Sequence, residues 1–233
     1  MKFRLVPALL ILLVVVVTVR LGFWQRDRAH RKEALEAQIT QFEHASTQTL
    51  TGAPVALKDI EFHRVKARGS FVADKVVYLG NRPYNDQPGF YVVMPFKLAG
   101  GGYVLVNRGW LPRNMINREI IAPYTTPQGE VEIEGIARAD ASRAFELGNG
   151  SAAHQLIRQN LDTAVYAAET DLPLQPFVIQ QLSDDGDKLI RDWPVPTSGV
   201  ERNYGYMFQW WGMAVAAVAF GLYAARKEHV PGV

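Results

Sequence analysis

The sequence predicts an α+β membrane protein: two transmembrane helices, N- and C-terminal, flank an extracytoplasmic domain built on an antiparallel β-meander or small barrel with a few helices. Residues 5–24 are predominantly apolar, residues 204–225 are uncharged, and the chain between them carries short Val-, Tyr- and Phe-rich runs separated by turn residues. The expected organisation is a cytoplasmic start at 1–4, a span at 5–24, the domain at 25–203, a span at 204–225 and a cytoplasmic tail at 226–233.

Composition excludes several classes of protein. A chain of 233 residues with 48% hydrophobic and 21% charged residues is typical of a folded protein with room for one sizeable domain. The net charge is only +2, so no basic field favours nucleic acid, and we expect no nucleic-acid partner. The absence of cysteine excludes disulfides, thiol catalysis, cysteine metal ligands and covalent haem attachment.

The first apolar run is interpreted as an uncleaved anchor. It reaches about the 20 residues that a bilayer requires. A cleaved signal peptide is the alternative, but no small-x-small cleavage pattern follows the run. Arg20 lies one turn before Trp24, so its side chain can reach the headgroups beside that aromatic ring and mark one membrane interface.

The second span opens with aromatic residues, as membrane interfaces favour: Tyr204, Tyr206, Trp210 and Trp211. Small residues recur within it every four positions at Ala217, Gly221 and Ala225. We expect this small-residue groove to receive bulky side chains of the first span, while lipid contact is the alternative. The lipid bilayer is thus one expected partner of the chain.

Charges at the ends predict the orientation. Lys2 and Arg4 precede the first span, and Arg226 and Lys227 follow the second, so the positive-inside rule places both termini in the cytoplasm. The domain would then lie in the periplasm of a bacterial inner membrane, or in the intermembrane space of a mitochondrion. A basic cluster just after the first span opposes this, but interspersed acidic residues mark it as a mixed-charge helix.

The domain is expected to begin with a helical continuation of the first span to about His44. A strand is predicted over residues 62–71, ending at a kink at Gly69, and half-exposed or final strands over 130–139 and 177–182. A short helix over 161–170, with Asn160 as its N-cap, is expected between the last two strands.

At the centre of the domain, residues 76–81, 90–96 and 103–106 predict three consecutive antiparallel strands. In such a meander the first and third strands finish at the same edge, about 10 Å apart. An Asn-Arg pair stands at the end of each of these two strands, which predicts a rim where an anion or a partner is bound. The candidates are Asn81, Arg82, Asn107, Arg108 and Trp110. Hydrogen bonds from these residues to loop carbonyls are the alternative.

Motifs for catalysis are missing from the sequence. It has no Gly-x-Ser-x-Gly elbow, His-Glu-x-x-His pair, Walker loop or Gly-x-Gly-x-x-Gly turn, and its five histidines share no close spacing. Asp184-Asp185-Gly186-Asp187 lacks the length and the terminal Glu of a calcium loop and is interpreted as an ordinary turn. We therefore expect no enzyme and no metal site.

Several short motifs, taken in their order along the chain, resemble those of a known protein family. They are Leu21-Gly22-Phe23-Trp24-Gln25, Arg68-Gly69-x-Phe71, Leu79-Gly80-Asn81-Arg82, Val104 to Trp110 with Pro112, and Gly205-Tyr206 to Gln209-Trp210. With one span at each end, this order resembles the Surfeit locus protein family over nearly the whole chain. The resemblance implies a membrane-bound assembly factor that helps haem a reach the catalytic subunit of cytochrome c oxidase, a haem-copper terminal oxidase, with haem a synthase as a second candidate partner.

One departure from the family concerns haem. Members that bind it carry a histidine just before the Gly-Tyr of the last span, and Asn203 stands there in this chain. Asn is a poor iron ligand, so we expect no tightly bound cofactor and at most a transient contact with haem a. The haem-proximal candidates are Asn203, Tyr206, Gln209 and Trp210. The alternative function is a membrane-anchored scaffold or ligand-binding protein for another client, such as a quinol oxidase.

Overall fold

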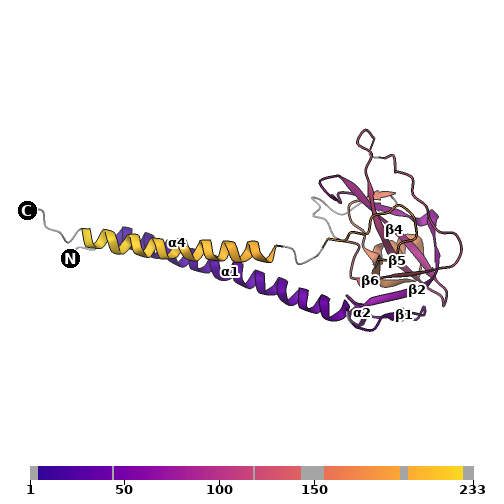
Figure 1. Ribbon diagram of the computed structural model, residues 1–233, viewed down its shortest axis with the longest axis horizontal. Coiled ribbons are helices and arrows are strands. Elements are labelled where there is room, and N and C mark those ends of the chain that lie inside the picture. Colours follow the sequence, from indigo (N-terminus) through magenta and orange to yellow (C-terminus); the bar gives the residue numbers. More distant parts are fainter. Residues whose placement is uncertain (1–4, 44, 118, 143–154, 195–198, 228–233) are drawn as a thin grey trace, which may run out of the picture. The chain divides into compact units, whose positions relative to one another are not determined.

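The computed structural model describes residues 5–43, 45–117, 119–142, 155–194 and 199–227. The chain divides into two compact units, one formed by Met1–Gln38 with Pro194–Val233 and the other by Ile39–Trp193. The first holds two long helices and the second holds the β-strands (Figure 1). Lys2 and Arg4, on which the predicted orientation partly rests, lie outside the described residues.

The helical unit consists of α1, Leu5–Glu43, up to Gln38, and α4, Val200–Lys227. Both helices are long and apolar enough to cross a bilayer. They lie side by side and antiparallel (Figure 1). A Cβ added at Gly221 would lie 3.3 Å from Ile11, so the predicted contact of a small residue with a bulky one is confirmed there.

The two helices also contact each other closely at Gly22 and Trp211. The Trp211 indole of α4 covers Gly22 of α1 so closely that any Cβ at Gly22 would overlap it. The Phe23 ring meets the same indole edge-on, with centroids 5.4 Å apart. Leu9, Leu13, Val215 and Phe220 remain exposed, as lipid-facing side chains are.

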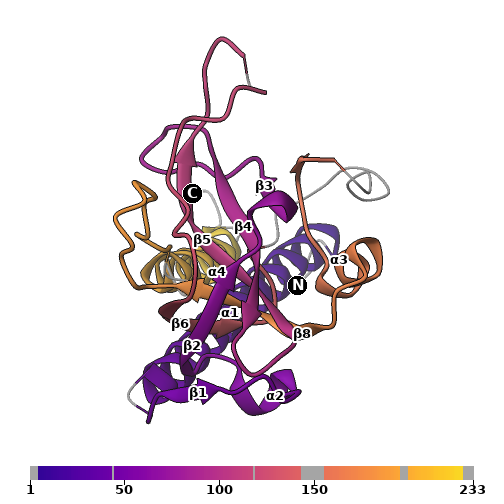
Figure 2. The same ribbon diagram turned by 90° about the vertical axis from the view of Figure 1, so that its right-hand side faces the viewer.

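The second unit is a closed β-barrel (Figure 2). Its strands are β1 Gln48–Leu50, β2 Arg64–Phe71, β3 Val77–Leu79, β4 Gly89–Leu98, β5 Tyr103–Pro112, β6 Val131–Arg138, β7 Ile157–Arg158 and β8 Leu174–Gln181. Its helices are α2 Leu57–Ile60, η1 Ala73–Lys75 and α3 Thr163–Thr170. The order of paired strands in the barrel is β2-β6-β8-β5-β4, and β4 pairs with β2 to close it. Outside this ring, β1 pairs with β2, β3 pairs with β4, and β7 pairs with β3.

Gly69 is where the barrel closes. Residues 64–69 of β2 pair with β6, and residues 69–71 pair with β4. A Cβ at Gly69 would overlap the Lys97 carbonyl, so only glycine permits this approach of the two backbones. The predicted end of the strand at Gly69 is therefore wrong: the strand bends there and continues to Phe71 with a new partner.

The core explains why β4 is apolar along nearly its whole length. One set of side chains fills the barrel, including Val65, Phe96 and Phe177. A second cluster, including Tyr91 and Tyr166, covers the outside of β4 and β5. Since both faces of β4 are covered, its sequence does not alternate as a half-exposed strand would.

The predicted meander is confirmed, because β3 pairs antiparallel with β4 and β4 with β5. The third strand is longer than predicted and runs six residues past Val106, to Pro112. The strands predicted at 130–139 and 177–182 are also present, as β6 and β8. The predicted cap of α3 is wrong: Asp162, rather than Asn160, accepts hydrogen bonds from the first helical N–H groups.

Replacing Gly69 with alanine is expected to destabilise the barrel by about 1–3 kcal/mol, because the new methyl group must displace the Lys97 backbone. Urea unfolding of the full chain in detergent, followed by tryptophan fluorescence, measures this. Gly80→Ala is the matched control, since a Cβ at Gly80 meets its neighbours at an ordinary 3.7 Å. Equal stability of the two variants would contradict the role assigned to Gly69.

Candidate functional site

Arg108 lies at a β-bulge in β5. Val92 pairs with Gly109 and Val93 with Asn107, so Arg108 is the extra residue and has no partner on β4. Gly109 has a φ of 150°, which suits glycine and marks the bulge. Such a bulge re-aims a side chain out of the regular alternation of a strand.

The re-aimed guanidinium of Arg108 is completely buried and held by an ion pair. Its Nη2 donates to the Asp187 carboxylate at 2.7 Å, and its Nη1 donates to Thr126 Oγ1 at 2.8 Å. The guanidinium also stacks over the Phe71 ring, with its central carbon 4.4 Å from the ring centroid. Asp187, equally buried, accepts a second charged hydrogen bond from Arg191 at 2.6 Å.

The charges of Arg108 and Asp187 serve to hold parts of the domain together. Burial lowers the pKa of the Arg108 guanidinium from its usual value, and the neighbouring Asp187 charge opposes that shift. The positive charge is thus neutralised within the domain and does not face a ligand. The cluster fastens the loop at 125–126 and the segment at 187–191 onto β5.

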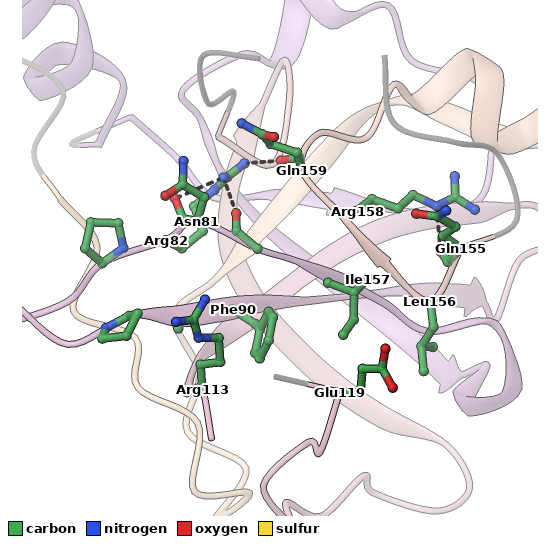
Figure 3. A pocket seen from close by; sticks show the side chains of 14 residues that line it. Asn81, Arg82, Phe90, Arg113, Glu119, Gln155, Leu156, Ile157, Arg158 and Gln159 are labelled. Atoms are coloured by element: carbon green, nitrogen blue, oxygen red, sulfur yellow. Dashed lines mark hydrogen bonds between the residues drawn. The ribbon is translucent and has the colours of Figure 1, made fainter. Parts of the chain in front are cut away.

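Arg82 is also buried, but backbone carbonyls hold it (Figure 3). Its Nη1 donates to Gly80 O at 2.7 Å, and its Nη2 donates to Ser142 O at 2.5 Å and Gln159 O at 3.0 Å. Its own carbonyl accepts the Trp110 indole N–H at 2.7 Å. Burial lowers the pKa of Arg82. Hydrogen bonding to loop carbonyls, the alternative considered from sequence, is therefore what Arg82 does.

The expected common rim for Arg82 and Arg108 is wrong. The backbone of Arg82 bonds to Gly89, and Gly89 pairs with Pro112 at the end of β5. Arg108 lies four positions before Pro112, within the strand. Asn107 and Trp110 are likewise buried within β5. The placement failed because the third strand continues beyond Val106.

Beside Arg82 lies a cleft of about 750 Å³ at the end of β5 (Figure 3). Of the predicted residues, Asn81 and Arg82 line it, whereas Asn107, Arg108 and Trp110 do not. The other lining side chains include Phe90, Arg113, Glu119, Gln155, Ile157 and Arg158. The cleft therefore combines three arginines and several amides with one carboxylate, that of Glu119, and with apolar side chains.

Arg113 is the cation of this cleft that sequence reasoning missed. Among the residues that the structure describes, no partner is found for its guanidinium, and its Nε is buried. Arg158, by contrast, is paired with Glu169 through hydrogen bonds of 2.6 and 3.1 Å. Arg113 directly follows Pro112, the last residue of β5. The strand predicted from the sequence ends at Val106, so the prediction did not place Arg113 at a strand end. This arrangement suits a carboxylate-bearing ligand or partner.

The haem-proximal candidates belong to the helical unit. Asn203 is only 8% exposed; its Oδ1 accepts from Lys32 Nζ at 3.0 Å, and its Nδ2 donates to Gln25 Oε1 at 2.8 Å. Its oxygen is thus engaged and does not fit the role of an iron ligand. Tyr206 and Gln209 are exposed and Trp210 is half-buried. Within the described residues, no group of three or more His, Asp or Glu side chains could hold a metal ion.

Comparison with known proteins gives a consistent family. The model of the SURF1 family matches residues 12–215. The chain is 28% identical to a SURF1-like protein of Rickettsia bellii over 232 residues, covering 95% of this chain and 91% of that protein. It is 33% identical to Surfeit locus protein 1 of Xenopus tropicalis over 150 residues and of Homo sapiens over 149. Those alignments cover 58% and 57% of this chain, and 48% and 49% of the vertebrate proteins, about half their length.

Replacing Arg108 with methionine is expected to cost about 2–3 kcal/mol of unfolding free energy, because buried Asp187 loses one of its two charged partners and keeps only Arg191. Urea unfolding of the full chain in detergent measures the loss. The control is Arg113→Gln, which removes a guanidinium without a described partner and should change stability by less than about 0.5 kcal/mol. Similar stabilities of the two variants would contradict the structural role assigned to the ion pair of Arg108 with Asp187.

Proposed function

This chain belongs to the SURF1 family, and from that membership we propose that it is a membrane-bound assembly factor for haem-copper terminal oxidase. In this role it assists the delivery of haem a to the catalytic subunit of cytochrome c oxidase. The observation that carries the proposal is the family match over residues 12–215, which includes most of both long helices and the whole barrel. The catalytic subunit is the proposed partner, with haem a synthase as a second.

A binding role, rather than an enzymatic one, is supported by how the polar residues are used. In the described part of the domain, the buried charges of Arg108, Asp187 and Arg158 pair with one another or with neighbouring side chains. Paired charges of this kind hold segments together instead of being poised for proton transfer. The cleft beside Arg113 is the proposed contact for the client, because its guanidinium offers a charge to an incoming carboxylate.

Haem a would be handled without a permanent site on this protein. Asn203 occupies the position at which the resemblance implies a histidine, and its side-chain oxygen already accepts a hydrogen bond from Lys32. We therefore propose that any contact of this chain with haem a is transient and that the partner subunit supplies the iron ligands. No step of the proposed function requires tightly bound haem.

The alternative client is a quinol oxidase, with the chain serving as a membrane-anchored scaffold or ligand-binding protein. The same helices and cleft would serve either client. The proposed location is a bacterial inner membrane, with the barrel in the periplasm. Arg226 at the end of α4 supports this orientation under the positive-inside rule.

Deleting the gene is expected to lower the amount of haem-loaded cytochrome c oxidase, with unchanged oxidase transcripts and haem a content, since an assembly factor changes yield. Difference spectra of membranes measure this. Complementation with Arg113→Glu should restore less oxidase than wild type, and Lys97→Glu, an exposed charge reversal outside the cleft, should restore it fully. Normal cytochrome c oxidase with a depleted quinol oxidase would transfer the proposal to the other client.

Fusion of reporters tests the orientation. Alkaline phosphatase joined after Gln128, in the barrel unit, is expected to be active because it is exported. The same enzyme joined at the C-terminus should be inactive, and a fluorescent protein there should mature. The reverse pattern would show that the basic residues after the first span, and not those at the termini, set the topology.

A further inference from the structure

A second cavity, of about 330 Å³, lies within the helical unit between α1 and the start of α4. Its lining carries three cations, Arg28, Lys32 and Arg202, together with Gln25, Gly199, Asn203 and Tyr206. No carboxylate is among these lining residues. A cavity with this lining has a positive potential that favours an anion.

Lys32 is held in place by hydrogen bonds, whereas Arg28 and Arg202 carry the charge that matters for a ligand. Lys32 Nζ donates to Asn203 Oδ1 at 3.0 Å and to the Gly199 carbonyl at 3.5 Å. Arg28 lies over the Trp24 ring, with its central carbon 5.5 Å from the ring centroid. Among the described residues, no carboxylate forms an ion pair with Arg28 or Arg202. Their charges are therefore available to a ligand.

The start of α4 adds to the positive potential. Gly199, Arg202 and Asn203 all belong to this end of the helix, where the first N–H groups have no acceptor within the helix. The helix dipole places partial positive charge at the same end. Glu201, in the same turn, is exposed and does not line the cavity.

The position along the helices identifies the kind of anion. Arg28 lies one turn beyond Trp24 on α1, and Tyr206 lies one turn beyond Arg202 on α4; Trp24 and Tyr206 are of the residue types that sit at the headgroup level of a bilayer. A neighbouring cavity of about 310 Å³ shares Arg28 and Lys32 and adds Arg31, Trp24 and Leu35. This second cavity thus offers an apolar wall next to the cationic one.

We propose that the two cavities bind the headgroup of an anionic phospholipid. The phosphate lies between Arg28 and Arg202, and the glycerol and the beginning of an acyl chain lie against Trp24, which is one turn nearer the membrane span than Arg28. Asn203 is a positioning residue in this site. Its Oδ1 accepts a hydrogen bond from the Lys32 ammonium, and its Nδ2 donates to Gln25, which fixes the orientation of the amide. The site does not depend on which oxidase is the client.

The test uses the full chain reconstituted in nanodiscs of phosphatidylcholine with a minor fraction of phosphatidylglycerol. Lipids retained by the protein after transfer to detergent are identified by native mass spectrometry. Wild type is expected to retain phosphatidylglycerol over phosphatidylcholine. The double variant Arg28→Gln, Arg202→Gln should reduce this preference roughly 30-fold, as loss of two cation–headgroup contacts implies. Arg26→Gln is the matched control, since Arg26 pairs with Asp27 at 3.1 Å and lines neither cavity.

Two further measurements separate the outcomes. Thermal unfolding in phosphatidylcholine shows whether the double variant folds, and the headgroup preference of wild type tests the site independently of any variant. Inorganic phosphate is added to detergent-solubilised protein as a competitor. Equal retention of both lipids by wild type, or an equal loss of preference in Arg26→Gln, would overturn the proposal. Displacement of the lipid by millimolar phosphate would show that a soluble anion is the ligand instead.

Discussion

The barrel unit depends on the burial of one positive charge. Removing a guanidinium from water is costly, and the structure offsets that cost only when the carboxylate of Asp187 and the hydroxyl of Thr126 reach Arg108 together. The consequence is that the loop at 125–126 and the segment at 187–191 are held on β5. That segment continues to Trp193, whose ring packs edge-on against Tyr91 on the outside of the sheet.

Barrel closure and the cleft follow from the same strands. β2 changes partner at Gly69 and so joins both edges of the sheet, which leaves fewer open strand edges. β5 continues past its bulge to Pro112 and delivers Arg113 to the cleft beside Arg82. A rigid barrel with a cation presented at the end of a long strand is a suitable base for recognising a partner.

The helical unit shows two different uses of polar residues. Gln25, Lys32 and Asn203 form a hydrogen-bonded chain between α1 and α4, which fixes the registration of the two helices next to the contact of Gly22 with Trp211. Arg28 and Arg202 lie beside that chain without a carboxylate partner among the described residues. The first set satisfies the protein's own polar groups, and the second set offers charge to the membrane surface.

The sequence by itself determined the elements whose signals are local: two apolar helices, the meander of β3 to β5, and strands β6 and β8, because length, hydropathy and turn residues lie within each segment. Asn81 and Arg82, which the sequence named as candidates for an anion or partner rim, line the cleft, although the Arg82 guanidinium is held by backbone carbonyls. Only the tertiary structure decided the role of Arg108, since its partner Asp187 is 79 positions away and nothing near Arg108 in sequence announces that carboxylate. The tertiary structure likewise decided the change of strand partner at Gly69. It also decided the placement of Arg113, which depends on β5 continuing to Pro112.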